Sequence, residues 1–170
     1  MTAQHALAPA DRIPAEVHCA QDYEALARRF IGGPAYAYVA GGSGADVTVE
    51  ANRRAFAELE ILPRLLRDVT AGSTRLRLLG RELAHPIVLA PVAFHKLVHP
   101  RGEVETARGA AVSDACIACS TLSSCSLEEI AGHAGPNRWF QLYFQPRREA
   151  SLDLVRRAEA AGYTALVVTL

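Results

Sequence analysis

The feature that most constrains this chain is a repeated alternation of apolar runs and helix-like stretches over residues 85–170. Four short apolar runs have the composition of buried strands: 86–90, 116–122, 138–144 and 165–168. Three stretches of helical character separate them: 103–115, 127–133 and 149–161. Strands that are apolar on both faces and alternate with helices are typical of a parallel sheet covered by its crossover helices. The sequence therefore predicts an α/β fold with a parallel sheet.

Units of this kind build either an open doubly wound sheet or a closed barrel. An open sheet that binds a dinucleotide normally carries a Gly-x-Gly-x-x-Gly loop after its first strand. Here the first run is followed by Pro91-Val92-Ala93-Phe94-His95, which contains no glycine. This loop disfavours a nicotinamide-binding sheet. A complete eight-stranded barrel needs about 250 residues, so four units would supply only half of one.

The first half of the chain has a different pattern. Helical spacing of apolar residues and flanking glycines predict three helices, over 23–30, 34–41 and 46–58. Asp22 is the expected N-cap of the first helix. Alternating polar and apolar residues over 75–84 predict a small hairpin. We therefore expect residues 1–84 to form a helical segment with a capping hairpin, and residues 85–170 to form the sheet.

Charge and hydropathy exclude several classes of partner. The chain has 18 basic and 18 acidic residues, without a basic stripe, which argues against nucleic acid. It has no run of about 18 apolar residues that could span a membrane. Residues 1–15 lack the basic-then-apolar pattern of a secretory signal and are expected to form a loose lead-in. We therefore expect a cytoplasmic protein.

Cys116 and Cys119 form a Cys-x-x-Cys pair, a spacing that can indicate zinc or redox chemistry. We favour a buried strand, because strand positions three apart point to opposite faces and their sulfurs would diverge. The sequence contains no second such pair and no paired histidines to complete a zinc site. We expect no metal.

The active site of a (β/α) barrel lies at the carboxyl ends of its strands. Small or hydrogen-bonding residues stand at the end of every predicted strand: Pro91, Val92 and Ala93, then Ser123, then Gln141 and Tyr143, then Thr169. On the third strand, Gln141 and Tyr143 share one face, and Phe140 and Leu142 share the other. We expect the apolar face to pack against helices and the Gln–Tyr face to meet a polar ligand. The alternative is that the Gln–Tyr face meets solvent.

Eight segments in a consistent order carry a family resemblance. They are 36–38 with Asp46, 50–56, 63–69, 86–93, 99–103, 120–124, 140–143 and 168–169. Together they resemble the FMN-dependent 2-hydroxy-acid oxidases and dehydrogenases, which include glycolate, lactate, mandelate and hydroxymandelate enzymes. The resemblance implies an FMN cofactor, a small 2-hydroxy acid as substrate, and the first four units of a (β/α)8 TIM barrel, preceded by helices and a hairpin.

The resemblance also implies roles for individual residues. The family's flavin-contacting positions match Pro91, Val92, Ala93, Ser123, Gln141 and Thr169. The tyrosine that helps to hold the substrate carboxylate matches Tyr38, for which helix packing is the alternative. The tyrosine beside the reacting hydroxyl, a substrate-binding and catalytic position, matches Tyr143. His95 and His99 are interpreted as loop residues, and Lys96 does not match the family's flavin lysine.

The family's catalytic His, its substrate-binding Arg and its flavin Lys match positions beyond Leu170. We therefore expect the 170 residues alone to be inactive, and to be completed by the remaining half of the same barrel. The complete enzyme is expected to be a homo-oligomer, a tetramer.

Cys125 stands where glycolate-oxidase-like members carry a bulky aromatic residue. A smaller wall predicts an aromatic substrate such as (S)-mandelate or 4-hydroxymandelate, with a lactate or glycolate type as the alternative. Two other functions are considered: a different barrel enzyme, such as a phosphosugar isomerase or aldolase, and a non-catalytic half-barrel assembly module.

Overall fold

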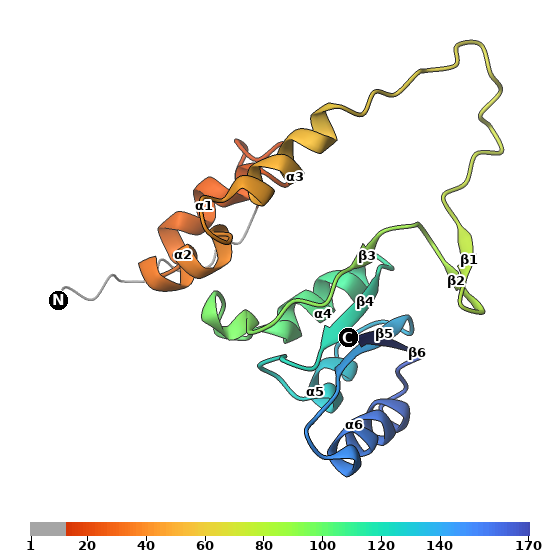
Figure 1. The fold of residues 1–170 in the computed structure, drawn as a ribbon. Coiled ribbons are helices and arrows are strands. Elements are labelled where there is room, and N and C mark those ends of the chain that lie inside the picture. Colours follow the sequence, from red (N-terminus) through yellow and green to blue (C-terminus); the bar gives the residue numbers. More distant parts are fainter. Residues whose placement is uncertain (1–12) are drawn as a thin grey trace. The chain divides into compact units, whose positions relative to one another are not determined.

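A computed structural model describes residues 13–170, so most of the expected lead-in at residues 1–15 lies outside it. The chain separates into two compact units, one ending at Ala71 and the other spanning Gly72–Leu170 (Figure 1). The hairpin falls in the second unit, together with the sheet. Each unit is described by itself.

The first unit contains the three predicted helices. They are α1 (Asp22–Phe30), α2 (Gly33–Ala40) and α3 (Val47–Ala57). Glu24 on α1 connects them, because it accepts a hydrogen bond from the Tyr36 hydroxyl at 2.8 Å and lies 3.4 Å from Arg53. Asp22 is the first helical residue and not the N-cap: its carboxylate reaches back to the amides of His18 and Cys19, at 2.8 and 2.9 Å.

The predicted hairpin is confirmed as two antiparallel strands, β1 (Leu76–Leu78) and β2 (Arg81–Leu83). Gly80 turns the chain between them with φ of +76°, a conformation that favours glycine. The side chain of Leu83 is buried, and the Asn137 side-chain amide donates to the Glu82 carbonyl at 3.2 Å. These contacts tie the hairpin to the unit that holds the sheet.

The predicted parallel sheet is confirmed. Its strands run in the order β3 (Val88–Leu89), β4 (Cys116–Ser120), β5 (Arg138–Tyr143) and β6 (Ala165–Thr169). The connections contain a short 3-10 turn η1 (His95–Leu97) and the helices α4 (Glu103–Val112), α5 (Leu127–Ala131) and α6 (Arg148–Ala160). The first strand is shorter than the predicted 86–90, since Pro86 has no amide hydrogen to donate to a ladder.

The core of the second unit lies between the sheet and its three helices. It is formed by buried side chains from α4, β4, α5, β5 and α6, such as Ala107, Ile117, Ile130, Phe140 and Ala158. The rings of Phe140 and Tyr163 meet edge to face, with centroids 6.3 Å apart. Phe140 and Leu142 are 0 % and 2 % exposed, which confirms that this face of β5 packs against helices.

The buried cysteines of β4 sit in this environment as free thiols. Burial raises the pKa of Cys116 and of Cys119 to about 11, so both remain protonated at neutral pH. Among residues 13–170, no cluster of three His, Cys, Asp or Glu side chains is arranged to hold a metal ion. No helix in that range is both long and apolar enough to cross a membrane.

Candidate functional site

The carboxyl ends of β4, β5 and β6 form one rim of the sheet. Parallel pairing places Ser120, Gln141 and Val167 in one row across the strands, and Tyr143 beside Thr169 one step further on. Residues in register point to the same face of a sheet. Three residues predicted from the sequence, Gln141, Tyr143 and Thr169, therefore share the face opposite the helices.

Gln141 is the centre of this rim. Gln141 is buried, with only 2 % of its surface exposed. The amide oxygen Oε1 accepts from the Thr121 backbone amide at 3.2 Å and from the Ser120 hydroxyl at 3.3 Å. The amide nitrogen Nε2 donates to Thr169 Oγ1 at 3.0 Å. A buried amide with these partners is held in one orientation.

The hydrogen bonds at the rim determine which neighbouring hydroxyls remain free to donate or to accept. A backbone amide can only donate, so Thr121 fixes Oε1 toward β4 and Nε2 toward Thr169. Thr169 Oγ1 accepts from Gln141, which leaves its own proton free to donate at the exposed end of β6. Ser123 donates its proton to the Ser120 carbonyl at 2.8 Å, which leaves its oxygen lone pairs free to accept. The rim thus presents both a donor and an acceptor.

The loop after β3 carries the remaining predicted flavin contacts. Pro91 and Val92 are exposed and Ala93 is half-buried. The next residue, Phe94, adopts φ of +55°, which is uncommon for a non-glycine residue. Its amide donates to the Leu122 carbonyl at 3.1 Å. The loop that carries Ala93 is thereby joined to the loop that carries Ser123.

The two predicted substrate tyrosines lie in different units. Tyr143 ends β5 on the same face as Gln141, is 41 % exposed, and is fixed through its backbone amide, which donates to Thr121 Oγ1 at 3.0 Å. Tyr38 lies on α2 of the first unit with 65 % of its surface exposed. At this exposure, the described residues of the first unit do not bury the Tyr38 side chain by helix packing.

Three residues that hold the rim and its loops in place were not predicted from the sequence. Ser120 and Thr121 hold Gln141 in place, and Thr121 Oγ1 also donates to the Gln141 carbonyl at 2.6 Å. Glu103, at the start of α4, accepts backbone amides from both rim loops. The Ser-Thr pair at a strand end was a usable signal. The glutamate gave none, because its partners lie far away in the sequence.

Cys125 is the residue on which the prediction of an aromatic substrate rests. It is buried in the core, and its thiol faces the Arg101 carbonyl at 3.8 Å, next to Gly102 at the start of α4. Its amide donates to Glu103 at 3.1 Å, which draws the residue toward that helix. Cys125 therefore packs between the loop after β4 and the start of α4, and its effect on the size of the substrate site stays a prediction.

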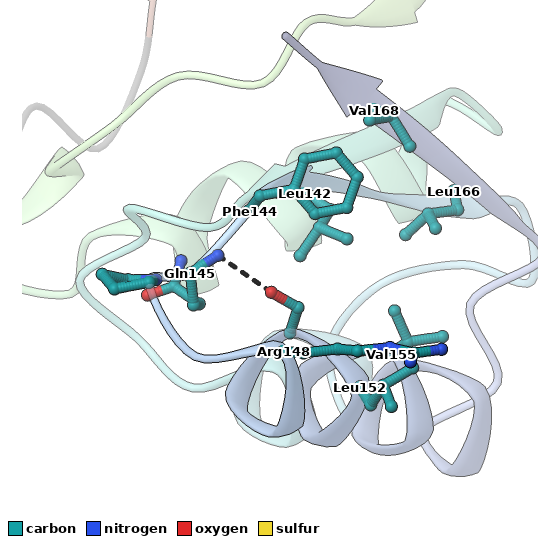
Figure 2. A pocket seen from close by; sticks show the side chains of 10 residues that line it. Leu142, Phe144, Gln145, Arg148, Leu152, Val155, Leu166 and Val168 are labelled. Atoms are coloured by element: carbon teal, nitrogen blue, oxygen red, sulfur yellow. Dashed lines mark hydrogen bonds between the residues drawn. The ribbon is translucent and has the colours of Figure 1, made fainter.

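A groove lies away from the rim, on the helix side of the sheet. Figure 2 shows its lining, which is apolar for the most part and has a volume of about 460 Å³. The lining side chains come from the end of β5, from β6 and from α6: Leu142, Phe144, Leu152, Val155, Leu166 and Val168. The Gln145 amide donates to Ser151 Oγ at 2.8 Å along one edge. The groove is an uncovered part of the packing layer between sheet and helices.

Comparison with known proteins places this architecture in a family. Residues 27–170 match the family of FMN-dependent dehydrogenases. An L-lactate oxidase of Alicycliphilus denitrificans is 60 % identical over 164 residues, which are 96 % of this chain and 45 % of the relative. A 4-hydroxymandelate oxidase of Amycolatopsis orientalis is 45 % identical over 149 residues, 88 % of this chain and 42 % of the relative.

A solved structure agrees with these sequence relatives. A mandelate oxidase crystallised with 3,3-difluoro-2-hydroxy-3-phenylpropionic acid has a TM-score of 0.82 and 44 % identity over 87 % of this chain and 44 % of its own. The chain spans less than half the length of the relatives it matches. The match to the family covers most of the chain, including every strand and helix of the sheet unit. This chain therefore belongs to the FMN-dependent dehydrogenase family.

Proposed function

We propose that the polypeptide to which these residues belong oxidises a 2-hydroxy acid to the 2-oxo acid with bound FMN. The observation that carries the proposal is the buried Gln141 amide, which fixes Thr169 as a hydrogen-bond donor at the rim in a chain of the FMN-dependent family. When bound, FMN supplies a two-electron acceptor for hydrogen removed from the substrate α-carbon. The chain's own residues bind FMN and the substrate and orient the two relative to each other.

The donor set of the rim fits a flavin. The polar edge of the isoalloxazine ring alternates carbonyl oxygens, which accept, with a ring N–H, which donates. Thr169 has a free hydroxyl proton for a carbonyl, and Ser123 has free lone pairs for the N–H. We assign Pro91, Val92 and Ala93 to the wall beside the ring, where the methyl group of Ala93 leaves room for a flat cofactor. An apolar wall with few placed polar groups is typical of cofactor sites.

Tyr143 and Tyr38 are the proposed substrate residues. A phenol can donate a hydrogen bond to the carboxylate or hydroxyl of a 2-hydroxy acid and so orient its α-carbon. The 41 % exposure of Tyr143, next along the face from Gln141, is compatible with such a contact. Tyr38 has a largely exposed side chain on α2 and is free to contribute in the same way.

Identity among relatives now favours a small substrate. The 60 % identity to an L-lactate oxidase exceeds the 45 % identity to a 4-hydroxymandelate oxidase, and we propose L-lactate as the first candidate. An aromatic 2-hydroxy acid is the second candidate, supported by the similarity to the mandelate oxidase structure. The small side chain of Cys125 supports the same candidate.

We further propose that the sheet is the first half of a (β/α)8 barrel, with residues 1–84 as a preceding segment and 85–170 as the barrel half. The outer edge of β6 and the groove beside α6 leave Leu166 and Val168 nearly half exposed. The remaining half of the barrel would cover both. The expected tetramer and the cytoplasmic location expected from the sequence pattern belong to the same proposal and are open to light scattering and cell fractionation.

Two measurements test the function. The visible spectrum and intact mass of the purified full-length protein give its cofactor and its length together, and we expect flavin absorbance. Values of kcat/KM for L-lactate and (S)-mandelate then decide between the substrates. A higher value for L-lactate supports the first candidate, and a higher value for mandelate replaces it with the second. A full-length protein without flavin that turns over neither acid contradicts the proposed function.

A further inference from the structure

Glu103 is a buried carboxylate at the start of α4, with only 3 % of its surface exposed. Its oxygen Oε1 accepts from the amides of Ser124 at 2.7 Å and His95 at 3.1 Å. Its oxygen Oε2 accepts from the amide of Cys125 at 3.1 Å. A buried carboxylate is costly unless donors surround it. Here the donors are the backbones of two separate loops.

These two loops follow β3 and β4, and further bonds join them directly. The Phe94 amide donates to the Leu122 carbonyl at 3.1 Å, and the Lys96 amide donates to Ser124 Oγ at 3.2 Å. Glu103 thus lies behind a cross-linked pair of loops and binds both. One substitution at Glu103 removes acceptors from both loops at once.

Gly102 permits this close approach. It has φ of +51°, and a Cβ atom there would lie 2.8 Å from Lys96 Cγ and 3.5 Å from the Cys125 sulfur. Only glycine fits both the conformation and the space. The start of α4 is therefore built to bring the Glu103 carboxylate against the two loops.

Glu103 is ionised at neutral pH. Burial acts to raise its pKa, but the amide hydrogen bonds, led by that of Ser124, outweigh burial and hold the pKa below the ordinary 4.5. Its position in the first turn of a ten-residue helix also favours a negative charge. A charged acceptor makes stronger hydrogen bonds than a neutral one, which suits a group that must hold two loops in register.

The same loops carry Ala93 and Ser123. We propose that Glu103 is a positioning residue for FMN: by joining the loop after β3 to the loop after β4, it sets the relative placement of Ala93 and Ser123. The inference rests on the proposed function and deepens it. Glu103 itself lies behind the loops, on the helix side, and acts on the cofactor only through them.

Glu103→Gln tests the proposal in the full-length protein. Glutamine keeps the size but replaces one acceptor oxygen with an NH₂ group that faces a backbone N–H. FMN binding to the apoprotein, measured by quenching of flavin fluorescence, is expected to weaken at least about tenfold, the equivalent of one charged hydrogen bond. Glu149→Gln, in the exposed first turn of α6, is the matched control and should bind FMN as the wild type does.

Amide hydrogen exchange in the apoprotein gives a readout that does not need the cofactor. The amides of His95, Ser124 and Cys125 should exchange faster in Glu103→Gln, while those of Phe140 and Leu142 stay protected. A purely structural role would instead speed exchange across the whole unit and leave the FMN affinity of the folded fraction unchanged.

The outcomes separate the two proposals. Wild-type FMN affinity in Glu103→Gln overturns the positioning role and leaves the proposed function intact. A wild-type protein that binds no FMN overturns both. If Glu103→Gln does not fold, Ser124→Ala takes its place, because it removes only the bond from Lys96. A severalfold loss of FMN affinity in that variant supports the coupling of the loops, and no loss contradicts it.

Discussion

Strands β4 and β6 belong to the same parallel sheet, yet their surroundings differ completely. All five residues of β4 are buried, whereas β6 alternates between half-buried and exposed positions. Strand β4 has a neighbour on each side and helices over one face, and β6 ends the order of the sheet. The polar rim is therefore anchored at the buried strands β4 and β5, and Thr169 extends it onto the exposed edge strand β6.

The buried core around β4 and β5 should be sensitive to the loss of side-chain volume. Phe140 is fully buried on β5, and Phe140→Ala leaves a cavity between α5, α6 and the sheet. We expect the free energy of unfolding to fall by about 3–5 kcal/mol. Urea unfolding followed by far-UV circular dichroism measures this loss. A loss below about 1 kcal/mol would show that the core is not packed as described.

The edge strand β6 gives a sharper test. Its residue Leu166 is the register partner of Phe140 and points to the same face of the sheet. In the structure of residues 13–170, 44 % of the Leu166 surface is exposed. If the rest of the barrel covers β6, Leu166→Ala in the full-length protein should cost what a buried leucine costs, about 2–5 kcal/mol. A cost near zero in the same urea experiment would mean that β6 stays an open edge, and would refute the completed barrel.

The smallest effect is expected at the surface between α5 and α6. Arg157 holds Glu128 through two bonds of 2.8 and 2.9 Å, and its guanidinium lowers the pKa of Glu128 to about 2. A lowered folded-state pKa adds stability above the ordinary 4.5, and that stability is lost as the pH falls toward 2. Because both side chains are about half exposed, the pair should contribute less than about 1 kcal/mol.

Arg157→Ala measures this contribution. The difference in unfolding midpoint between the variant and the wild type should be small at pH 7, should narrow between pH 4.5 and pH 2, and should also shrink in high salt. Arg156→Ala, its exposed neighbour on α6, is the control. A difference that grows as the pH falls would contradict the ion pair.

Local patterns in the sequence predicted the sheet well. Continuous apolar runs gave β4, β5 and β6, and alternation along β5 separated the face of Phe140 from the face of Gln141, because both signals depend on neighbouring residues. The same rules overextended β3, which begins only after Pro86 and Ile87, where Pro86 has no amide hydrogen and the Ile87 amide donates to His85. They also took Asp22 for a cap, although its carboxylate binds amides before the helix.

The site was only partly predictable. The resemblance supplied Gln141, Thr169 and Ser123, but it did not supply the groups that hold them. Thr121 Oγ1 and Glu103 bond to backbone groups about 20 residues away. The Ser-Thr pair at the strand end is a local signal for Thr121, whereas no local pattern indicates Glu103. The direction of Cys125 also depends on such a contact, the bond from its amide to Glu103.

The central claim is that the rim anchored by Gln141 holds FMN. The most direct test is a titration of FMN into the full-length apoprotein and its Gln141→Met variant, which keeps the shape and removes the hydrogen bonds to Thr121 and Thr169. The wild type should bind one FMN per chain, and the folded variant should bind at least about tenfold more weakly. Equal affinity in the two proteins, or no binding by the wild type, would contradict the claim.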